Sequence, residues 1–180
     1  MASSLTDEVV EDARRGDSAA LTALYESVAP GVLAYLRARG SADPEALMQD
    51  VFVQLLPRIR RVSGGARGVR ALAFTIAHAR LVDELRRRGR SLEISVAEPV
   101  DWKAHVSAED EVMNGSTGAT AMLASLGEAQ RTVIMLRIFG DLSVEQTASI
   151  LGKSVGAVKQ LQRRGILALR NMLAERGWPQ

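Results

Sequence analysis

The chain has 180 residues, of which 47% are hydrophobic and 24% are charged, and these values are typical of a globular protein rather than a disordered or fibrous one. It contains no cysteine, which excludes disulfides, thiolate metal sites and a nucleophilic thiol. Acidic residues such as Asp7, Glu8 and Glu11 indicate that the N-terminus is not a signal peptide, and no run of about 18 apolar residues predicts a membrane span. We therefore expect a soluble cytoplasmic protein without membrane contact of its own.

The net charge of +2 conceals an uneven distribution. Lys and Arg counted against Asp and Glu give +3 for residues 1–90, −6 for 91–128 and +5 for 129–180. Two basic segments separated by an acidic one predict two modules that face a polyanion, joined by a linker that avoids it. The alternative is an ordinary solvated linker whose acidity has no role.

Apolar residues in the first half recur at helical rather than strand spacing. A long helix is predicted after Asp17, its N-cap, and Gly40 is expected to end it. The pair Asp43-Pro44 predicts the cap and first residue of a second helix, which runs to about Pro57. A loop is expected at 63–68, which holds three glycines, and a third helix is predicted from Val69 into the arginines at 86–90.

The second half is predicted to be helical again after a linker at 91–118. A short helix near Met122 and a helix around Val133, Ile134, Leu136 and Ile138 are followed by a break at Gly140-Asp141. Ser143 and Gln146 have the spacing of a capping box, and Ser154 is expected to cap a final long helix.

The two last helices, joined by a short turn at Gly152, have the pattern of a helix-turn-helix. Ala148 and Val158 occupy positions where two short helices pack at a steep angle. The second helix would then expose a polar face that suits DNA, because Gln can bind adenine and Lys or Arg can bind guanine or phosphate. The alternative is a plain helical hairpin with a basic face.

Candidate catalytic groups are few. His78 is interpreted as a polar surface or DNA-facing group rather than a ligand, and Asp83 and Glu84 as ion-pair partners on a helix. The cluster Arg86-Arg87-Arg88-Gly89-Arg90 either contacts nucleic acid or complements the helix dipole. Because no phosphate loop, nucleophile or metal constellation is present, we predict no enzymatic activity, no metal and no cofactor.

Three segments in order resemble bacterial sigma factors of the extracytoplasmic-function (ECF) group of the sigma-70 family. Residues 43–52 are similar to the helix that docks on RNA polymerase, residues 73–88 to the helix that recognises and melts the downstream promoter element, and residues 126–159 to the fourth sigma domain. The resemblance implies an all-α protein with sigma domain 2 at 1–90, a flexible acidic linker at 91–118 and sigma domain 4 at 119–180.

The resemblance also implies a function. Such a chain binds core RNA polymerase, recognises the upstream (−35) and downstream (−10) elements of promoter DNA, promotes melting, and is controlled by an anti-sigma factor. The resemblance assigns polymerase docking to Leu47, Gln49, Asp50 and Phe52. Phe52 is expected to pack inside the protein rather than touch the partner. The glycine-rich loop would capture a base flipped from the opened strand. The positions implied to contact DNA are Ser63, Gly64, Gly65, Phe74, His78, Arg80, Arg86, Arg87, Ser154, Gly156, Ala157, Lys159, Gln160, Arg163 and Arg164.

Two other functions are compatible with the residues themselves. A stand-alone helix-turn-helix repressor would bind duplex DNA without polymerase, at a palindromic site set by two-fold symmetry. An enzyme acting on nucleic acid would need a metal or general-base constellation, which the sequence does not supply.

Overall fold

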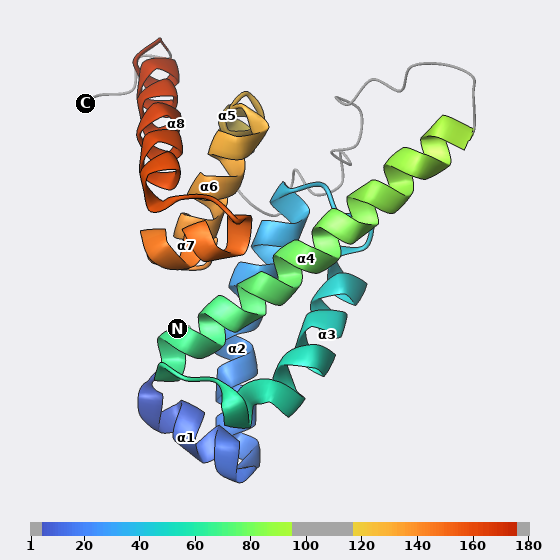
Figure 1. Ribbon diagram of the computed structural model, residues 1–180, viewed down its shortest axis with the longest axis vertical. Helices are drawn as coiled ribbons and strands as arrows, with labels where there is room; N and C mark the ends of the chain where they lie inside the picture. The colour runs from blue at the N-terminus through green and yellow to red at the C-terminus, as the bar shows by residue number, and fades with distance from the viewer. Residues whose placement is uncertain (1–4, 95–116, 176–180) are drawn as a thin grey trace.

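The computed structural model describes residues 5–94 and 117–175, which form helices and short turns without a β-strand (Figure 1). The N-terminal helices, α1–α4, make one bundle, and the C-terminal helices, α5–α8, make a second group beside it. The expected linker at 91–118 lies largely outside the described residues. The elements are α1 (Asp7–Arg15), α2 (Ser18–Ala38), α3 (Pro44–Leu55), the 3-10 helix η1 (Leu56–Arg61), α4 (Gly65–Ile94), α5 (Thr117–Ala124), α6 (Glu128–Phe139), α7 (Val144–Leu151) and α8 (Val155–Glu175).

Helix α2 is the central helix of the N-terminal bundle. As predicted, Asp17 caps it, its side chain accepting a hydrogen bond from the Ala20 backbone at 2.7 Å. Leu24, Val32 and Tyr35 are completely buried because α2 packs against α1, α3, α4 and also α6. By length and composition α2 could cross a membrane, but here its apolar face forms the core of the bundle.

A helix that the sequence analysis did not predict precedes Asp17. Helix α1 is capped by Thr6, whose hydroxyl accepts from the Val9 backbone at 3.3 Å, and it buries Val10 and Ala13 against the bundle. The charged side chains of α1 complement the helix dipole, because acidic residues lie in its first turn and Arg14 and Arg15 lie in its last turn. The N-terminal acidic residues therefore have a structural role.

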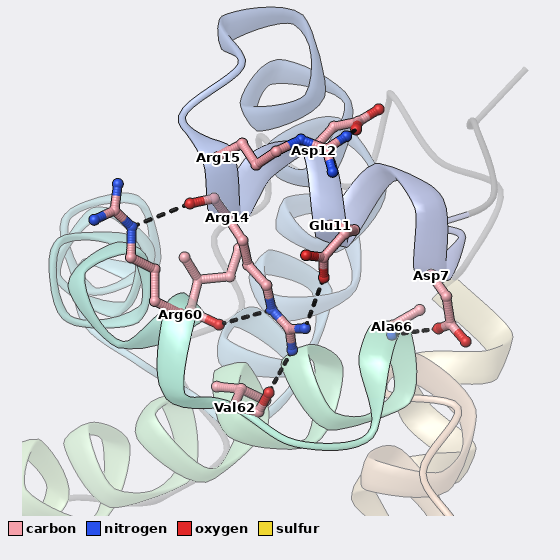
Figure 2. A network of polar contacts seen from close by, with 9 residues as sticks. Asp7, Glu11, Asp12, Arg14, Arg15, Arg60, Val62 and Ala66 are labelled. Carbon is pink, nitrogen blue, oxygen red and sulfur yellow. Dashed lines mark hydrogen bonds and ion pairs between the residues drawn. The ribbon is translucent and has the colours of Figure 1, made fainter.

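Arg14 ties α1 to the segment that leads into α4 (Figure 2). Its Nε donates to the Ile59 carbonyl at 3.3 Å, and its guanidinium donates to the Val62 carbonyl and pairs with Glu11. In return, Arg60 Nε donates to the Arg14 carbonyl at 3.0 Å. The end of η1 and its exit are thus held by a side chain more than forty positions earlier in the chain.

Helix α4 begins at Gly65, so the prediction of a six-residue loop at 63–68 was wrong. The turn before it uses glycines at positive φ, +84° at Gly64 and +54° at Gly65. The Asp7 carboxylate accepts a hydrogen bond from the Ala66 backbone at 2.8 Å and so caps α4 from α1 (Figure 2). A Cβ at Gly65 would overlap that carboxylate. Because this cap comes from a distant helix, local glycine content could not reveal where α4 begins.

The end of α4 also differs from the prediction. Its helical backbone passes through the arginine cluster and continues to Ile94, four residues beyond the expected end of the first module at residue 90. Near the first arginines, Glu84 accepts from Ser41 Oγ at 2.7 Å and from the Ala42 backbone at 2.6 Å. Glu84 therefore holds the turn between α2 and α3, a role beyond the expected pairing along its own helix.

Helix α6 is buried on two sides. Met135 and Leu136 belong to the same apolar core as the N-terminal helices, whereas Val133 packs with Ala148 of α7 and Val158 of α8. Ile138, which was predicted to belong to this helix, is 64% exposed. The capping box of α7 and the cap of α8 form as predicted: Gln146 and Ser143 bond reciprocally at 2.8 and 3.1 Å, and Ser154 accepts from the Ala157 backbone at 3.1 Å.

The cap supplied by Asp7 can be tested by a pair of substitutions. Asp7 and Glu8 are both exposed acidic residues in the first turn of α1, so each interacts similarly with the dipole of that helix. Asp7→Ala also frees the Ala66 amide and should lower the free energy of unfolding by about 0.5–2 kcal/mol. Urea unfolding followed by circular dichroism measures the change, and Glu8→Ala is the control. Equal effects of the two substitutions would contradict the cap.

Candidate nucleic-acid interface

The first half of α8 presents a polar face to solvent. Val158 is completely buried and fixes the helix against α6 and α7, which turns the residues on either side of it outward. Ala157 is half-buried, and Ser154 lies at the exposed cap. The exposed positions predicted to contact DNA are Gly156, Lys159, Gln160, Arg163 and Arg164. This arrangement of a buried anchor and an exposed cationic and amide face is typical of a recognition helix in the major groove.

A second cationic surface lies along α4. Arg86 and Arg87 are exposed, and Arg80 is 42% exposed in its side chain. Arg88 differs from them, since it donates to the Gly40 carbonyl at 3.0 Å and is thereby tied to the end of α2. Among the arginine side chains that the structure describes here, Arg86 and Arg87 contact only Asp83 of their own helix, whereas Arg88 also contacts the end of α2.

Two residues predicted for different partners lie together. Asp50 of α3, predicted for polymerase, pairs with Arg80 of α4, predicted for DNA, at 2.9 Å. Gln54 Nε2 also donates to Asp50 at 3.1 Å. Both charged side chains are about 40% exposed. This ion pair therefore lies where the residues of α3 predicted for polymerase meet the residues of α4 predicted for DNA.

The outer face of α3 carries the other residues predicted to dock on polymerase. Gln49 is exposed, Leu47 is half-buried, and Phe52 is 5% exposed with its ring 4.6 Å from that of Tyr25. Phe52 therefore packs inside and supports the surface.

Sequence reasoning missed three apolar residues at this surface. Val53 is 69% exposed, Tyr25 is 42% exposed and Leu56 is 40% exposed. Gln49, Val53 and Leu56 follow one another at helical spacing, so a helical-wheel count outward from Gln49 could have found Val53 and Leu56. Exposed apolar groups gathered on one face are typical of a protein–protein contact.

The segment predicted to capture a flipped base is divided by the start of α4. Ser63 and Gly64 are exposed in the turn, whereas Gly65 is the first helical residue and is half-buried beneath Asp7. The two exposed residues leave backbone that a base can approach closely.

Phe74 and His78 lie deeper than a DNA contact requires. Phe74 is 1% exposed, with its ring edge-on to Tyr35 at 5.8 Å, so it does not present its face to solvent in this arrangement. His78 Nδ1 and the Tyr35 hydroxyl form a hydrogen bond of 2.8 Å. Both residues predicted to meet opened DNA thus take part in the packing of α4 on α2.

Burial and one neighbouring cation control the titration of this pair. Burial raises the pKa of Tyr35 to about 12. Burial, and then the positive charge of Arg39, lowers the pKa of His78 from its usual 6.5. The Arg39 side chain is only 6% exposed and pairs at 3.2 Å with Glu128 at the start of α6. The same two influences lower the pKa of Arg131 on α6.

Two protein families match separate parts of the chain. The family described as Sigma-70 region 2 matches residues 24–91, which include α3 and most of α4. The family described as Sigma-70, region 4 matches residues 122–171, which include α6, α7 and most of α8.

Similar sequences cover most of the chain. The ECF RNA polymerase sigma factor ShbA of Streptomyces griseus is 33% identical, over 90% of this chain and 92% of its own length. The ECF RNA polymerase sigma factor BldN of Streptomyces coelicolor is 31% identical over 93% of this chain, which spans 66% of the length of BldN. SigD of Mycobacterium tuberculosis, another such factor, is 29% identical over 95% of this chain and 85% of its own.

Two solved structures have a similar fold. CnrH, solved with the cytosolic domain of CnrY, has a TM-score of 0.62 at 22% identity, covering 94% of this chain and 97% of its own. The sigma factor RpoE of Bartonella quintana, solved with the anti-sigma factor NepR, has a TM-score of 0.62 at 23% identity, covering 83% of this chain and 94% of its own.

The lowered pKa of His78 predicts a pH dependence of stability. Because the pKa of His78 is lower in the folded chain than in the unfolded one, folding favours the neutral imidazole. The contribution of this neutral form to the free energy of unfolding is complete above the unfolded pKa of 6.5. It is lost as the pH falls below 6.5 through the folded value. The free energy of unfolding should therefore fall less steeply in His78→Gln than in the wild type between about pH 7 and pH 5. Urea unfolding at each pH measures both slopes, and parallel slopes would contradict the assignment.

Proposed function

Because the chain belongs to the extracytoplasmic-function (ECF) group of RNA polymerase sigma factors, we propose that it binds core RNA polymerase and directs it to promoters with two spaced elements. The helix-turn-helix of α7 and α8 reads the upstream (−35) element. The turn before α4 and the arginines along α4 recognise the downstream (−10) element and favour its melting. The observation that supports this most directly is the exposed cationic and amide face of α8, held outward by buried Val158.

The docking surface on polymerase is proposed to be the outer face of α3. Gln49, Val53 and Leu56 form an exposed stripe, and Tyr25 extends it from α2. Phe52 supports the stripe from beneath through its contact with Tyr25. Burial of the exposed apolar side chains of this stripe against a partner removes them from water and therefore favours binding.

The division of the chain is proposed as domain 2 at 1–90, an acidic linker at 91–118 and domain 4 at 119–180. We propose that the chain has no enzymatic activity and acts in the cytoplasm as a dissociable subunit of polymerase. An anti-sigma protein would hold it inactive by covering these surfaces. The surface on α3 and the surface on α8 each carry an exposed apolar residue, Val53 and Leu167 respectively. We expect an anti-sigma protein that covers these surfaces to bury both side chains.

Transcription in vitro tests the proposal. Core RNA polymerase is incubated with a pool of genomic fragments, with and without this protein, and transcript starts are mapped. We expect starts that need the protein and share two spaced upstream motifs. Val53→Glu should abolish these starts and the capture of core polymerase. No protein-dependent start, together with retention of duplex fragments by the protein alone, would replace the proposal with a stand-alone repressor.

Substitutions on α8 separate base reading from phosphate binding. Gln160→Ala should cost about 1–3 kcal/mol on the preferred upstream element and little on other duplexes. Arg163→Ala should weaken all duplexes and, if the arginine binds one phosphate, lower the slope of log K against log salt by about 0.9. Fluorescence anisotropy across a salt series measures both. Asn171→Ala, exposed near the other end of α8, is the control, and an equal loss there would argue against a reading face at Lys159–Arg164.

A further inference from the structure

The turn at Ser63 and Gly64 lies directly against the first residues of α4. A Cβ built on Gly68 would lie 1.8 Å from the carbonyl oxygen of Ser63 and 3.1 Å from a methyl carbon of Val62. The Gly68 amide also donates a hydrogen bond to the Gly64 carbonyl at 2.9 Å. Glycine inside a helix is less favourable than alanine, so Gly68 is explained by the close approach of this turn rather than by α4 itself.

Helix α1 holds the same turn at both ends (Figure 2). Before the turn, the Arg14 guanidinium donates to the Val62 carbonyl. After the turn, the Asp7 carboxylate accepts from the Ala66 amide at 2.8 Å. Asp7 and Arg14 belong to the first and last turns of α1, so the two contacts are separated by nearly the whole length of this helix. The turn is therefore held at three points, by Arg14, by Asp7 and by its contact with Gly68.

The contacts that hold the turn use one set of its polar groups and leave another. The carbonyls of Val62 and Gly64 and the amide of Ala66 are bonded within the protein. The amides of Ser63 and Gly64 and the Ser63 hydroxyl donate to none of the residues that the structure describes, and both residues are exposed. The turn therefore presents hydrogen-bond donors to solvent from a backbone that is held in place.

Discrimination between bases requires donors in fixed positions. A base turned out of its strand is read by hydrogen bonds to its Watson–Crick edge, and a shift of the donors by about 1 Å breaks such bonds. Glycine has more conformational freedom than any other residue, so a turn that contains Gly64 and Gly65 would not keep one geometry without support. Contacts to phosphates supply affinity whatever the base, so a displaced turn should lose selectivity more than affinity.

We propose that Asp7 and Gly68 are positioning residues that determine which base of single-stranded DNA the turn at Ser63 and Gly64 accepts. Neither of them has to touch the base, because each acts through the backbone of the turn. The inference rests on the proposed function, in which the opened downstream element supplies the base. It gives α1, which carries Asp7, a part in the choice of promoter.

Gly68→Ala and Asp7→Ala test the proposal in the full-length protein. Gly68→Ala favours the helical backbone but forces the Ser63 carbonyl away, and it removes no polar group. Its matched control is Gly89→Ala in the same helix, where a Cβ meets no neighbouring atom within 4 Å. Asp7→Ala removes the cap of α4, and Glu8→Ala is its control. Asp7→Asn is the conservative variant, since its side-chain carbonyl can still accept the capping hydrogen bond.

The measurement is a selection from random single-stranded DNA. Each protein, its fold checked by circular dichroism, is immobilised and offered short strands of random sequence, and the bound strands are quantified and sequenced. We expect the wild type to prefer one base at one position of the bound strands. Gly68→Ala and Asp7→Ala should lower that preference about tenfold while binding a similar total amount of DNA. Asp7→Asn, Glu8→Ala and Gly89→Ala should keep the preference of the wild type.

Three results would overturn the proposal. The first is a base preference that survives in both Gly68→Ala and Asp7→Ala, and the second is a wild type that prefers no base. The third is a parallel fall of preference and total binding, which a purely structural role of the two residues predicts. If Gly68→Ala does not fold, the comparison of Asp7→Ala with Asp7→Asn decides between the same outcomes.

The selection contains no polymerase, so it is independent of the transcription test. A chain whose base preference depends on Asp7 and Gly68 but which directs no transcription refutes the proposed function and leaves the positioning role intact. A chain that directs transcription while these substitutions leave its base preference unchanged refutes the positioning role alone.

Discussion

Exclusion of water from the apolar face of α2 is the constraint on which the other elements depend. Leu24, Val32 and Tyr35 are completely buried because four other helices pack around α2, each contributing one apolar face. Burial of such side chains stabilises the fold by about 1.5–3 kcal/mol each, far more than any surface ion pair. The faces that remain outside this packing, on α3, α4 and α8, are the ones left for partners.

Polar side chains then fix the turns between the helices over long distances in sequence. Arg14 and Asp7 of α1 hold the exit of η1 and the start of α4, while Glu84 holds the turn before α3. Each satisfies backbone groups that the helix ends would leave unpaired. The turn at Ser63 and Gly64 is consequently held by contacts with α1 on both sides, while its own two residues remain exposed.

Function and packing share several residues along α4. Phe74 and His78 have the chemistry expected of residues that meet DNA, yet they also join α4 to Tyr35. Arg80 likewise pairs with Asp50 rather than standing free. Under the proposed function, DNA contacts by these residues would therefore compete with their contacts inside the chain.

The sequence by itself determined the helical class, the N-caps at Asp17, Ser143 and Ser154, and the helix-turn-helix, because periodicity and capping depend on residues a few positions apart. Its resemblance to ECF sigma factors also led to the family to which the chain belongs. Helix α1 was missed, and the start of α4 was predicted wrongly. Those features were decided by tertiary structure, since they depend on contacts between residues far apart in the chain, which no local pattern records.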